Sequence, residues 1–299
     1  MSRATGVVLL SVLSLLPTTA SAQSITSDFE TWLDANGYAS FDFERDDLAG
    51  GSFGGRTSPS DPVVRDPVIF VHGNGDRADV WSPSRSAFLA AGYTNAELYA
   101  TTWGPASIAQ VSQQYHSREH LEHLRAFAEA VLDYTGAAKV DIISHSMGVT
   151  LMRKVVQGGW ANDALAGGNY WLGGALTSDV DTFVGIAGAN QGLVSCYLTG
   201  PTTPTCGATN GLYPGYLWWG TGPYNVSDIL VDINGSVGDE GDFIYTIWST
   251  GDGIVGYGGL VYGEYTSRIP GQDGEVVYST LGHFDVRDLT TSVQVMLVQ

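Results

Sequence analysis

The sequence predicts an α/β protein whose mostly parallel, doubly wound sheet carries helices on both faces. Short, almost continuously apolar segments alternate along the chain with helical segments. Segments this apolar are typical of parallel strands buried on both faces, because a strand with one solvated face would alternate with polar residues. The predicted strands are Val68–Val71, Leu98–Ala100, Val140–Ile143, Phe183–Ile186, Phe243–Trp248 and Val276–Tyr278.

The clearest predicted helix lies between the second and third of these strands. Its apolar residues recur at helical spacing on one stripe, and Gly136 ends it. The stripe consists of Leu121, Leu124, Ala128, Val131 and Leu132. A shorter helix is expected to open at a capping box of Ser27 and Glu30 and to end near Gly37.

Residues 1–22 have the features of a cleaved secretory signal. Arg3 precedes the apolar stretch Gly6–Leu16, and Ala20–Ala22 is typical of a cleavage site. The stretch is too short to span a bilayer. We therefore expect a secreted protein, extracellular or periplasmic.

Residues 23–299 are expected to form a single α/β domain. A glycine-rich stretch, Gly50–Gly55, belongs to an N-terminal strap over residues 23–62 that we expect to wrap the surface. A second irregular region, residues 193–235, is expected to be an insertion. It contains Cys196 and Cys206, which we expect to form a disulfide because exported proteins enter oxidising compartments.

The same insertion contains an aromatic stretch, Leu212–Trp219. Two interpretations stay open: packing of a cap over the sheet, or an apolar wall or adsorbing surface for an insoluble substrate. Further along, the acidic run Asp239–Asp242 is expected to be a solvated turn.

The formal net charge of -18 at pH 7 narrows the possible partners. Such a surface repels phosphate backbones, so nucleic-acid binding is excluded as a function class. No segment after the signal has the length and apolarity of a membrane helix, so an integral membrane protein is not expected.

The strongest chemical signal is the stretch Ser144–Gly148, which follows a predicted strand and precedes a predicted helix. A serine at a sharp strand-to-helix turn is the arrangement of a nucleophile elbow, with Ser146 as the nucleophile. Small residues are needed two positions before and after it, because strand and helix nearly touch there. Gly148 meets this requirement, and Ser144 is still compact.

A serine nucleophile needs a histidine base and a carboxylate that orients the base, in the chain order Ser, Asp, His. His283 is the one histidine that follows Ser146, and it lies after a predicted strand. Asp252 follows the strand Phe243–Trp248 and is our predicted acid. Asp242 and Asp181 precede their strands, and Asp285 is too close to His283 in sequence.

Backbone N–H groups complete the predicted site. The loop after the first strand, His72–Asp76, contains two glycines that let the backbone turn tightly toward a ligand. We predict that the N–H groups of Asn74 and Met147 form an oxyanion hole. His72 is expected to be a structural, hydrogen-bonded residue.

One competing motif is a His-x-x-Glu-His pattern. His116, Glu119 and His120 match a zinc-peptidase helix, and His123 could add a ligand. The alternative interpretation is the polar flank of the amphipathic helix, and no downstream cluster of ligands supports a metal site. Metal hydrolysis is therefore the minor hypothesis, and no cofactor is expected.

Pro67–Asp76 and His145–Gly148 together resemble the class 2 bacterial lipases, and most closely the lipase-like extracellular polyhydroxybutyrate depolymerases. The segments Leu193–Tyr197 and Pro204–Gly207 around the cysteines are similar to theirs as well. The resemblance runs from about Gly50 to His283 and departs at Ser144, where relatives usually carry Ala or Gly.

The resemblance implies an α/β-hydrolase fold, a triad at Ser146, Asp252 and His283, and oxyanion donors at Asn74 and Met147. It also implies an ester substrate, for which an insoluble lipid and a polyester surface are candidates. The family includes triglyceride lipases, short-chain esterases and polyester depolymerases, so the resemblance leaves the particular ester open. A secreted lipase or esterase is the leading hypothesis and a polyhydroxyalkanoate depolymerase the alternative. A non-catalytic binding protein on the same fold is the hypothesis from another class.

Overall fold

The computed structural model describes residues 24–299, so the predicted signal peptide lies outside the described residues. Its central sheet has seven strands in the order β1-β3-β2-β4-β7-β10-β13. Only β1 is antiparallel to its neighbour; every other pair is parallel. The strands are β1 (Ser52–Phe53), β2 (Val68–Val71), β3 (Leu98–Thr101), β4 (Val140–His145), β7 (Val180–Ile186), β10 (Phe243–Ser249) and β13 (Gly274–Tyr278).

Every strand predicted from the sequence is present, and the predicted fold class is confirmed. The main differences are at strand ends. β4 continues two residues beyond Ile143 to His145, so the strand leads directly into Ser146. β7 begins earlier than expected, at Val180.

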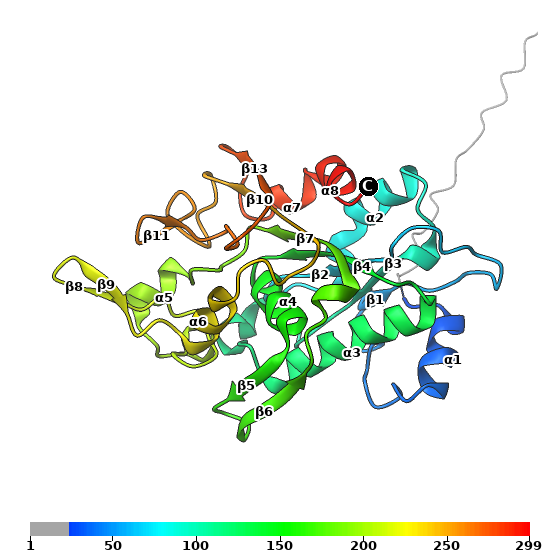
Figure 1. The fold of residues 1–299 in the computed structure, drawn as a ribbon, viewed down its shortest axis with the longest axis horizontal. Coiled ribbons are helices and arrows are strands. Elements are labelled where there is room, and N and C mark those ends of the chain that lie inside the picture. The colour runs from blue at the N-terminus through cyan, green and yellow to red at the C-terminus, as the bar shows by residue number, and fades with distance from the viewer. Residues whose placement is uncertain (1–23) are drawn as a thin grey trace, which may run out of the picture.

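Helices cover both faces of this sheet (Figure 1). α1, α3, α4 and α6 lie on one side, and α2, α7 and α8 on the other. The helices are α1 (Ser27–Ala35), α2 (Ser82–Ala90), α3 (Arg118–Thr135), α4 (Met147–Gln157), α5 (Val194–Thr199), α6 (Asp228–Gly235), α7 (Asp285–Asp288) and α8 (Thr291–Leu297). Short 3-10 segments are η1 (Ala78–Trp81), η2 (Asn95–Glu97), η3 (Ile108–Gln113), η4 (Thr177–Asp179) and η5 (Pro204–Cys206).

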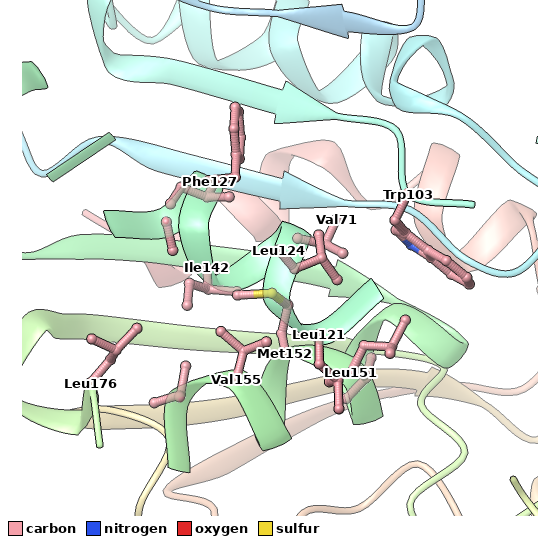
Figure 2. Close-up of a cluster of buried hydrophobic side chains, with 14 of the residues drawn as sticks. Val71, Trp103, Leu121, Leu124, Phe127, Ile142, Leu151, Met152, Val155 and Leu176 are labelled. Carbon is pink, nitrogen blue, oxygen red and sulfur yellow. The ribbon is translucent and has the colours of Figure 1, made fainter. Parts of the chain in front are cut away.

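Two hydrophobic clusters lie on opposite faces of the sheet. Successive residues of β2 divide between them: Ile69 and Val71 belong to the cluster under α3 and α4, whereas Val68 and Phe70 belong to the cluster under α2 and α8. Figure 2 shows the first cluster, in which Leu124 of α3 and Met152 of α4 lie over the sheet. The strands are thus buried on both faces, as their apolar composition predicts.

The end predicted for one helix is confirmed, and the start predicted for another is wrong by one residue. Gly136 caps α3 in the left-handed conformation, with φ 67°. α1 begins at Ser27, but the side chain that caps it belongs to Thr26, which accepts from the N–H of Phe29. The predicted capping box at Ser27 is therefore wrong by one residue.

The N-terminal segment lies against the body of the protein. α1 contacts α3, and β1 adds an antiparallel edge strand in which Phe53 pairs with Ala100. The glycine-rich stretch Gly50–Gly55 contains β1, and its glycines approach neighbouring side chains closely: a Cβ on Gly55 would clash with Oγ1 of Thr26.

Three small hairpins lie outside the central sheet. They are β5 (Gly159–Asp163) with β6 (Gly168–Gly173), β8 (Tyr216–Trp218) with β9 (Thr221–Tyr224), and β11 (Leu260–Val261) with β12 (Glu264–Tyr265). The expected disulfide between Cys196 and Cys206 joins α5 to η5.

The acidic run Asp239–Asp242 is a solvated turn at Asp239 and Asp242, which are exposed, but the expectation is wrong for Glu240. Glu240 is fully buried and accepts from Nε of Arg153, which is also fully buried, at 2.8 Å. Asn190 and Asn234 accept further hydrogen bonds from the same guanidinium. A buried cation requires such partners, because its desolvation would otherwise be strongly unfavourable.

Within residues 24–299, no helix has the length and apolarity that crossing a membrane would require.

A buried carboxyl in β4 predicts a pH dependence of stability. Burial, followed by the negative charges of Asp66 and Asp181, raises the pKa of Asp141 to about 8. An unfolded aspartate loses its proton near its ordinary pKa of about 4, so the folded protein holds one extra proton between about pH 4 and pH 8. Stability from this site is therefore lost as the pH rises through that window.

We predict that Asp141→Asn raises the free energy of unfolding at pH 8 by on the order of 4 kcal/mol, with little effect at pH 4. Asparagine keeps the acceptor for the N–H of Thr182, which lies 3.1 Å from Oδ1 of Asp141. Urea unfolding at both pH values measures the effect, and exposed Asp34→Asn is the control for the same change of charge. An equal gain at both pH values would contradict the prediction.

Candidate active site

The residue between β4 and α4 is held in an unusual backbone conformation. Ser146 has φ 56° and ψ -126°, and its N–H donates to the carbonyl of Ile186 at 2.9 Å. A positive φ costs about 1–3 kcal/mol for a residue other than glycine, so the surrounding packing must impose it. This is the sharp turn that the sequence predicts at Ser144–Gly148.

That turn requires small residues around it. A Cβ on Gly148 would lie 2.5 Å from the carbonyl oxygen of His72 and 2.9 Å from that of Val71. A Cβ on Gly73 would lie 2.9 Å from Cβ of Ser146. The first turn of α4 thus presses directly on the end of β2, which places the loop after β2 beside the serine.

Three of the predicted site residues form one row of hydrogen bonds. Nδ1 of His283 donates to Oδ2 of Asp252 at 2.6 Å, and Nε2 of His283 lies 3.0 Å from Oγ of Ser146. A carboxylate can only accept, so the hydrogen on the ring is at Nδ1 and Nε2 is free to accept the serine hydroxyl. The structure therefore brings together residues separated by up to 137 positions.

Asp252 is fixed in the turn after β10. It is buried, and its Oδ1 accepts from the backbone N–H groups of Ile254 at 2.8 Å and Val255 at 3.2 Å. The other aspartates considered from the sequence lie elsewhere: Asp242 pairs with Lys139, and Asp285 accepts from the N–H of Gly282.

A second histidine, which the sequence analysis did not single out, supports the first. Nε2 of His145 donates to the backbone carbonyl of His283 at 3.0 Å, and the two rings lie 4.6 Å apart. Burial lowers the pKa of His145 well below its usual value, so the ring is neutral and its donor is fixed at Nε2. Its place directly before Ser146, at the end of a buried strand, is the signal that could have identified it.

The predicted oxyanion donors lie beside Ser146. Met147 is the first residue of α4, so its N–H has no carbonyl one turn earlier in the helix. Asn74 lies in the turn after β2, where its Nδ2 donates to the carbonyl of Val111 at 2.9 Å. Both residues line the same cavity as Ser146 and His283.

An ion pair ties this loop to the segment that carries the histidine. Nη1 of Arg287, in α7, donates to Oδ2 of Asp76 at 2.7 Å. Burial raises the pKa of Asp76, and the charge of Arg287 counteracts that rise. The pair was not predicted; the small number of basic residues in the chain is the signal that could have drawn attention to Arg287.

His72 occupies a structural position. Its Nε2 accepts from the N–H of Trp103 at 3.1 Å, and its Nδ1 donates to the carbonyl of Gly73 at 2.7 Å. The ring is stacked on Trp103, and burial lowers its pKa to about 3. It is therefore neutral and already fully hydrogen-bonded.

The zinc-peptidase pattern does not form a single helical face. α3 begins at Arg118 after the N-cap Ser117, so His116 lies outside the helix that carries His120. His116 is buried and hydrogen-bonded to Thr150 and Asn210. Among residues 24–299, no group of three or more His, Cys, Asp or Glu side chains is arranged to hold a metal ion.

Ser146 and His283 line a cavity of about 430 Å³. Its lining is mostly apolar and comes from the segment around η3, from α5 and from the loops after β10 and β13. Its apolar side chains include Ile108, Val111, Leu193, Leu212, Ile254 and Phe284. Such a cavity suits an uncharged, largely hydrocarbon ligand.

The sheet order and the serine turn between β4 and α4 define an α/β-hydrolase. Residues 65–296 match the family model described as lipase (class 2). The chain therefore belongs to the class 2 lipase family.

Solved structures agree on the fold. Aspergillus fumigatus lipase B is 16% identical, with a TM-score of 0.54 over 85% of this chain and 57% of its own. The mature form of Bacillus licheniformis lipase BlEst2 is 14% identical, with a TM-score of 0.53 over 83% of this chain and 98% of its own. This chain thus spans little more than half the length of the first of them.

The close approach at Gly148 gives a prediction for the site. We expect Gly148→Ala to push α4 away from β2 and to displace Ser146, because backbone atoms cannot make room for the Cβ. The rate constant kcat/KM for a soluble p-nitrophenyl ester should fall about a hundredfold, and stability by about 1–3 kcal/mol.

The control is Gly235→Ala at the end of α6, where a Cβ would meet nothing within 4 Å. It should leave both quantities unchanged. Wild-type turnover in the Gly148 variant would show that the helix does not depend on this contact.

Proposed function

We propose that this protein is a secreted carboxylic-ester hydrolase, a lipase or esterase, that acts through Ser146, His283 and Asp252. One observation carries the proposal: the unbroken row of hydrogen bonds from Oγ of Ser146 through the ring of His283 to Asp252. The family membership supports the reaction class, and the apolar cavity supports an ester with a hydrocarbon acyl group.

In the first half of the proposed reaction, Nε2 of His283 takes the proton of Ser146 while Oγ attacks the ester carbonyl. Asp252 stabilises the imidazolium that forms and holds the ring in the required tautomer. The N–H groups of Asn74 and Met147 donate to the oxyanion. His283 then gives its proton to the leaving alcohol, which leaves an acyl group on Ser146.

In the second half, a water molecule replaces the alcohol. His283 takes a proton from the water, the resulting hydroxide attacks the acyl carbonyl, and the tetrahedral intermediate is again held by the same N–H groups. Collapse of this intermediate releases the acid, and His283 returns the proton to Ser146. Each proton that leaves the serine is thus restored, and no cofactor enters the scheme.

The proposal includes export and a single domain after residue 22. The sequence features of residues 1–22 support a cleaved signal. The disulfide between Cys196 and Cys206 supports an oxidising destination, because cytosolic thiols are kept reduced.

Ser146→Ala is expected to lower kcat for p-nitrophenyl butyrate by at least about 10³-fold while leaving the folded structure intact. The matched control is Ser195→Ala, since Ser195 lines the same cavity but makes no hydrogen bond to His283. Near-normal turnover by the Ser146 variant would refute the assignment.

A fluorophosphonate probe separates the enzyme from a non-catalytic binding protein on the same fold. The wild-type protein should be labelled covalently at Ser146, and His283→Ala should slow labelling strongly, because the hydroxyl then lacks its base. Absence of labelling in the wild-type protein would favour the binding protein.

The alternative substrate is a polyhydroxyalkanoate polyester, which the resemblance of the loop Pro67–Asp76 suggests. Clearing of emulsified triacylglycerol beside suspended polyhydroxybutyrate, together with p-nitrophenyl esters of increasing chain length, distinguishes lipase, esterase and depolymerase.

A further inference from the structure

The β8–β9 hairpin exposes an unusual number of large apolar side chains. Every residue from Tyr216 to Asn225 is exposed, including Trp218 at 62% and Trp219 at 90%. Leu217 and Tyr224 are exposed as well. Figure 1 shows the hairpin projecting from one end of the molecule, with α5 between it and the sheet. A cap that packed over the sheet would bury these side chains, so the packing interpretation of Leu212–Trp219 holds only for its buried first half, residues 212–215.

The tip of this hairpin places a tryptophan where the backbone disfavours it. Trp218 pairs with Thr221, so Trp219 and Gly220 form a two-residue turn, and both have positive φ, 48° and 79°. Turns of this kind favour Asn-Gly, because a bulky side chain at positive φ is strained. A residue that is both strained and exposed contributes nothing to folding that asparagine would not, which points to a role outside the fold.

The hairpin also lies in a segment without charge. No Asp, Glu, Lys, Arg or His occurs between Asp181 and Asp228, although the chain as a whole has 31 acidic and 13 basic residues. Charged groups would have to be desolvated at an apolar surface, so their absence favours contact with one. The negative charge of the rest of the protein repels anionic lipid.

The hairpin is connected to the candidate active site through α5. The hydroxyl of Tyr262 donates to the carbonyl of Gly215, at the base of the hairpin, at 2.5 Å, and the ring of Tyr262 packs on Tyr197 of α5. Other residues of α5, Ser195 and Thr199, line the cavity. At the cavity itself, Ile108, Ile254 and Phe284 are exposed lining residues, so both ends of this connection present apolar side chains.

We propose that the β8–β9 hairpin is an adsorption arm that holds the enzyme on the surface of an uncharged lipid, an emulsified triacylglycerol, through Trp218 and Trp219. The inference rests on the proposed function and adds the physical form of the substrate to it. Triacylglycerol is favoured because the cavity beside α5 is lined by aliphatic side chains that match a hydrocarbon chain, whereas a polyester chain would bring an ester carbonyl into it every few atoms.

The test uses the full-length protein with Trp218→Thr and Trp219→Asn. Threonine suits a strand and asparagine suits the turn, so the hairpin should fold as well as before. The matched control replaces Trp160 and Trp171, another exposed pair, at 66% and 56%, on the β5–β6 hairpin. Adsorption to triolein emulsion is measured by sedimentation in the Ser146→Ala background, and turnover of soluble p-nitrophenyl butyrate in the active protein.

The hairpin variant should adsorb to triolein at least about tenfold more weakly, because two tryptophans lose their apolar contact area. Its turnover of the soluble ester should be unchanged, and the control pair should adsorb like the wild type. Quenching of tryptophan fluorescence by brominated triolein should fall in the hairpin variant alone.

Unchanged adsorption of the hairpin variant, or an equal loss in the control pair, would overturn the proposal. Stronger wild-type adsorption to phosphatidylglycerol vesicles or to polyhydroxybutyrate granules than to triolein would overturn it as well. Failure of the proposed function looks different: the wild-type protein would not turn over the soluble ester, whatever its adsorption.

Discussion

The contact between the first turn of α4 and the end of β2 is the constraint on which the candidate site depends. Gly148 brings the helix so close to the carbonyls of Val71 and His72 that not even a Cβ would fit. The same approach forces Ser146 to positive φ and brings the loop that contains Asn74 to the N-terminus of α4. The backbone conformation of Ser146, the place of the predicted oxyanion donors and the position of the cavity are therefore consequences of one packing requirement. The strain at Ser146 is sustained by a core that is buried on both sides of β4.

Around this contact, the orientation of His283 is set by hydrogen bonds to its ring and to its backbone. Its ring is fixed by Asp252, which is itself held by two backbone N–H groups, and its backbone is fixed by the neutral ring of His145. Arg287 then links α7 to Asp76 in the opposite loop. These partners are buried or nearly so, and their interactions are therefore little screened by solvent, which helps to keep Ser146, His283 and Asp252 at hydrogen-bonding distance.

Features that depend on neighbouring residues are predictable from this sequence, whereas contacts between residues far apart in the chain are not. The strands were identifiable because parallel strands are apolar throughout, and Ser146 because its turn lies between a strand and a helix in consecutive residues. The start of α1 was placed one residue late because Thr26 and Ser27 are both good caps, and only the backbone decides between them. The burial of Glu240 is not visible in the sequence, because its partner, Arg153, lies on α4, far away in the chain. The ion pair between Asp76 and Arg287, which are 211 positions apart, is not predictable from the sequence for the same reason.

Charged and uncharged residues are unevenly distributed along the chain, and the two kinds of region interact differently with water and with an apolar surface. The carboxylates that give the protein its net charge of -18 keep it dispersed in water, and such a charge also opposes adsorption to any anionic surface. An enzyme that must reach an insoluble ester therefore needs an uncharged region that adsorbs while the remainder stays hydrated. The segment from residue 182 to 227 has this composition, and it supplies both part of the cavity wall and the exposed hairpin. Helix α5 forms part of the cavity wall, and Tyr262 contacts both α5 and the base of the hairpin. Adsorption through the tip of the hairpin would therefore keep that wall close to the substrate surface.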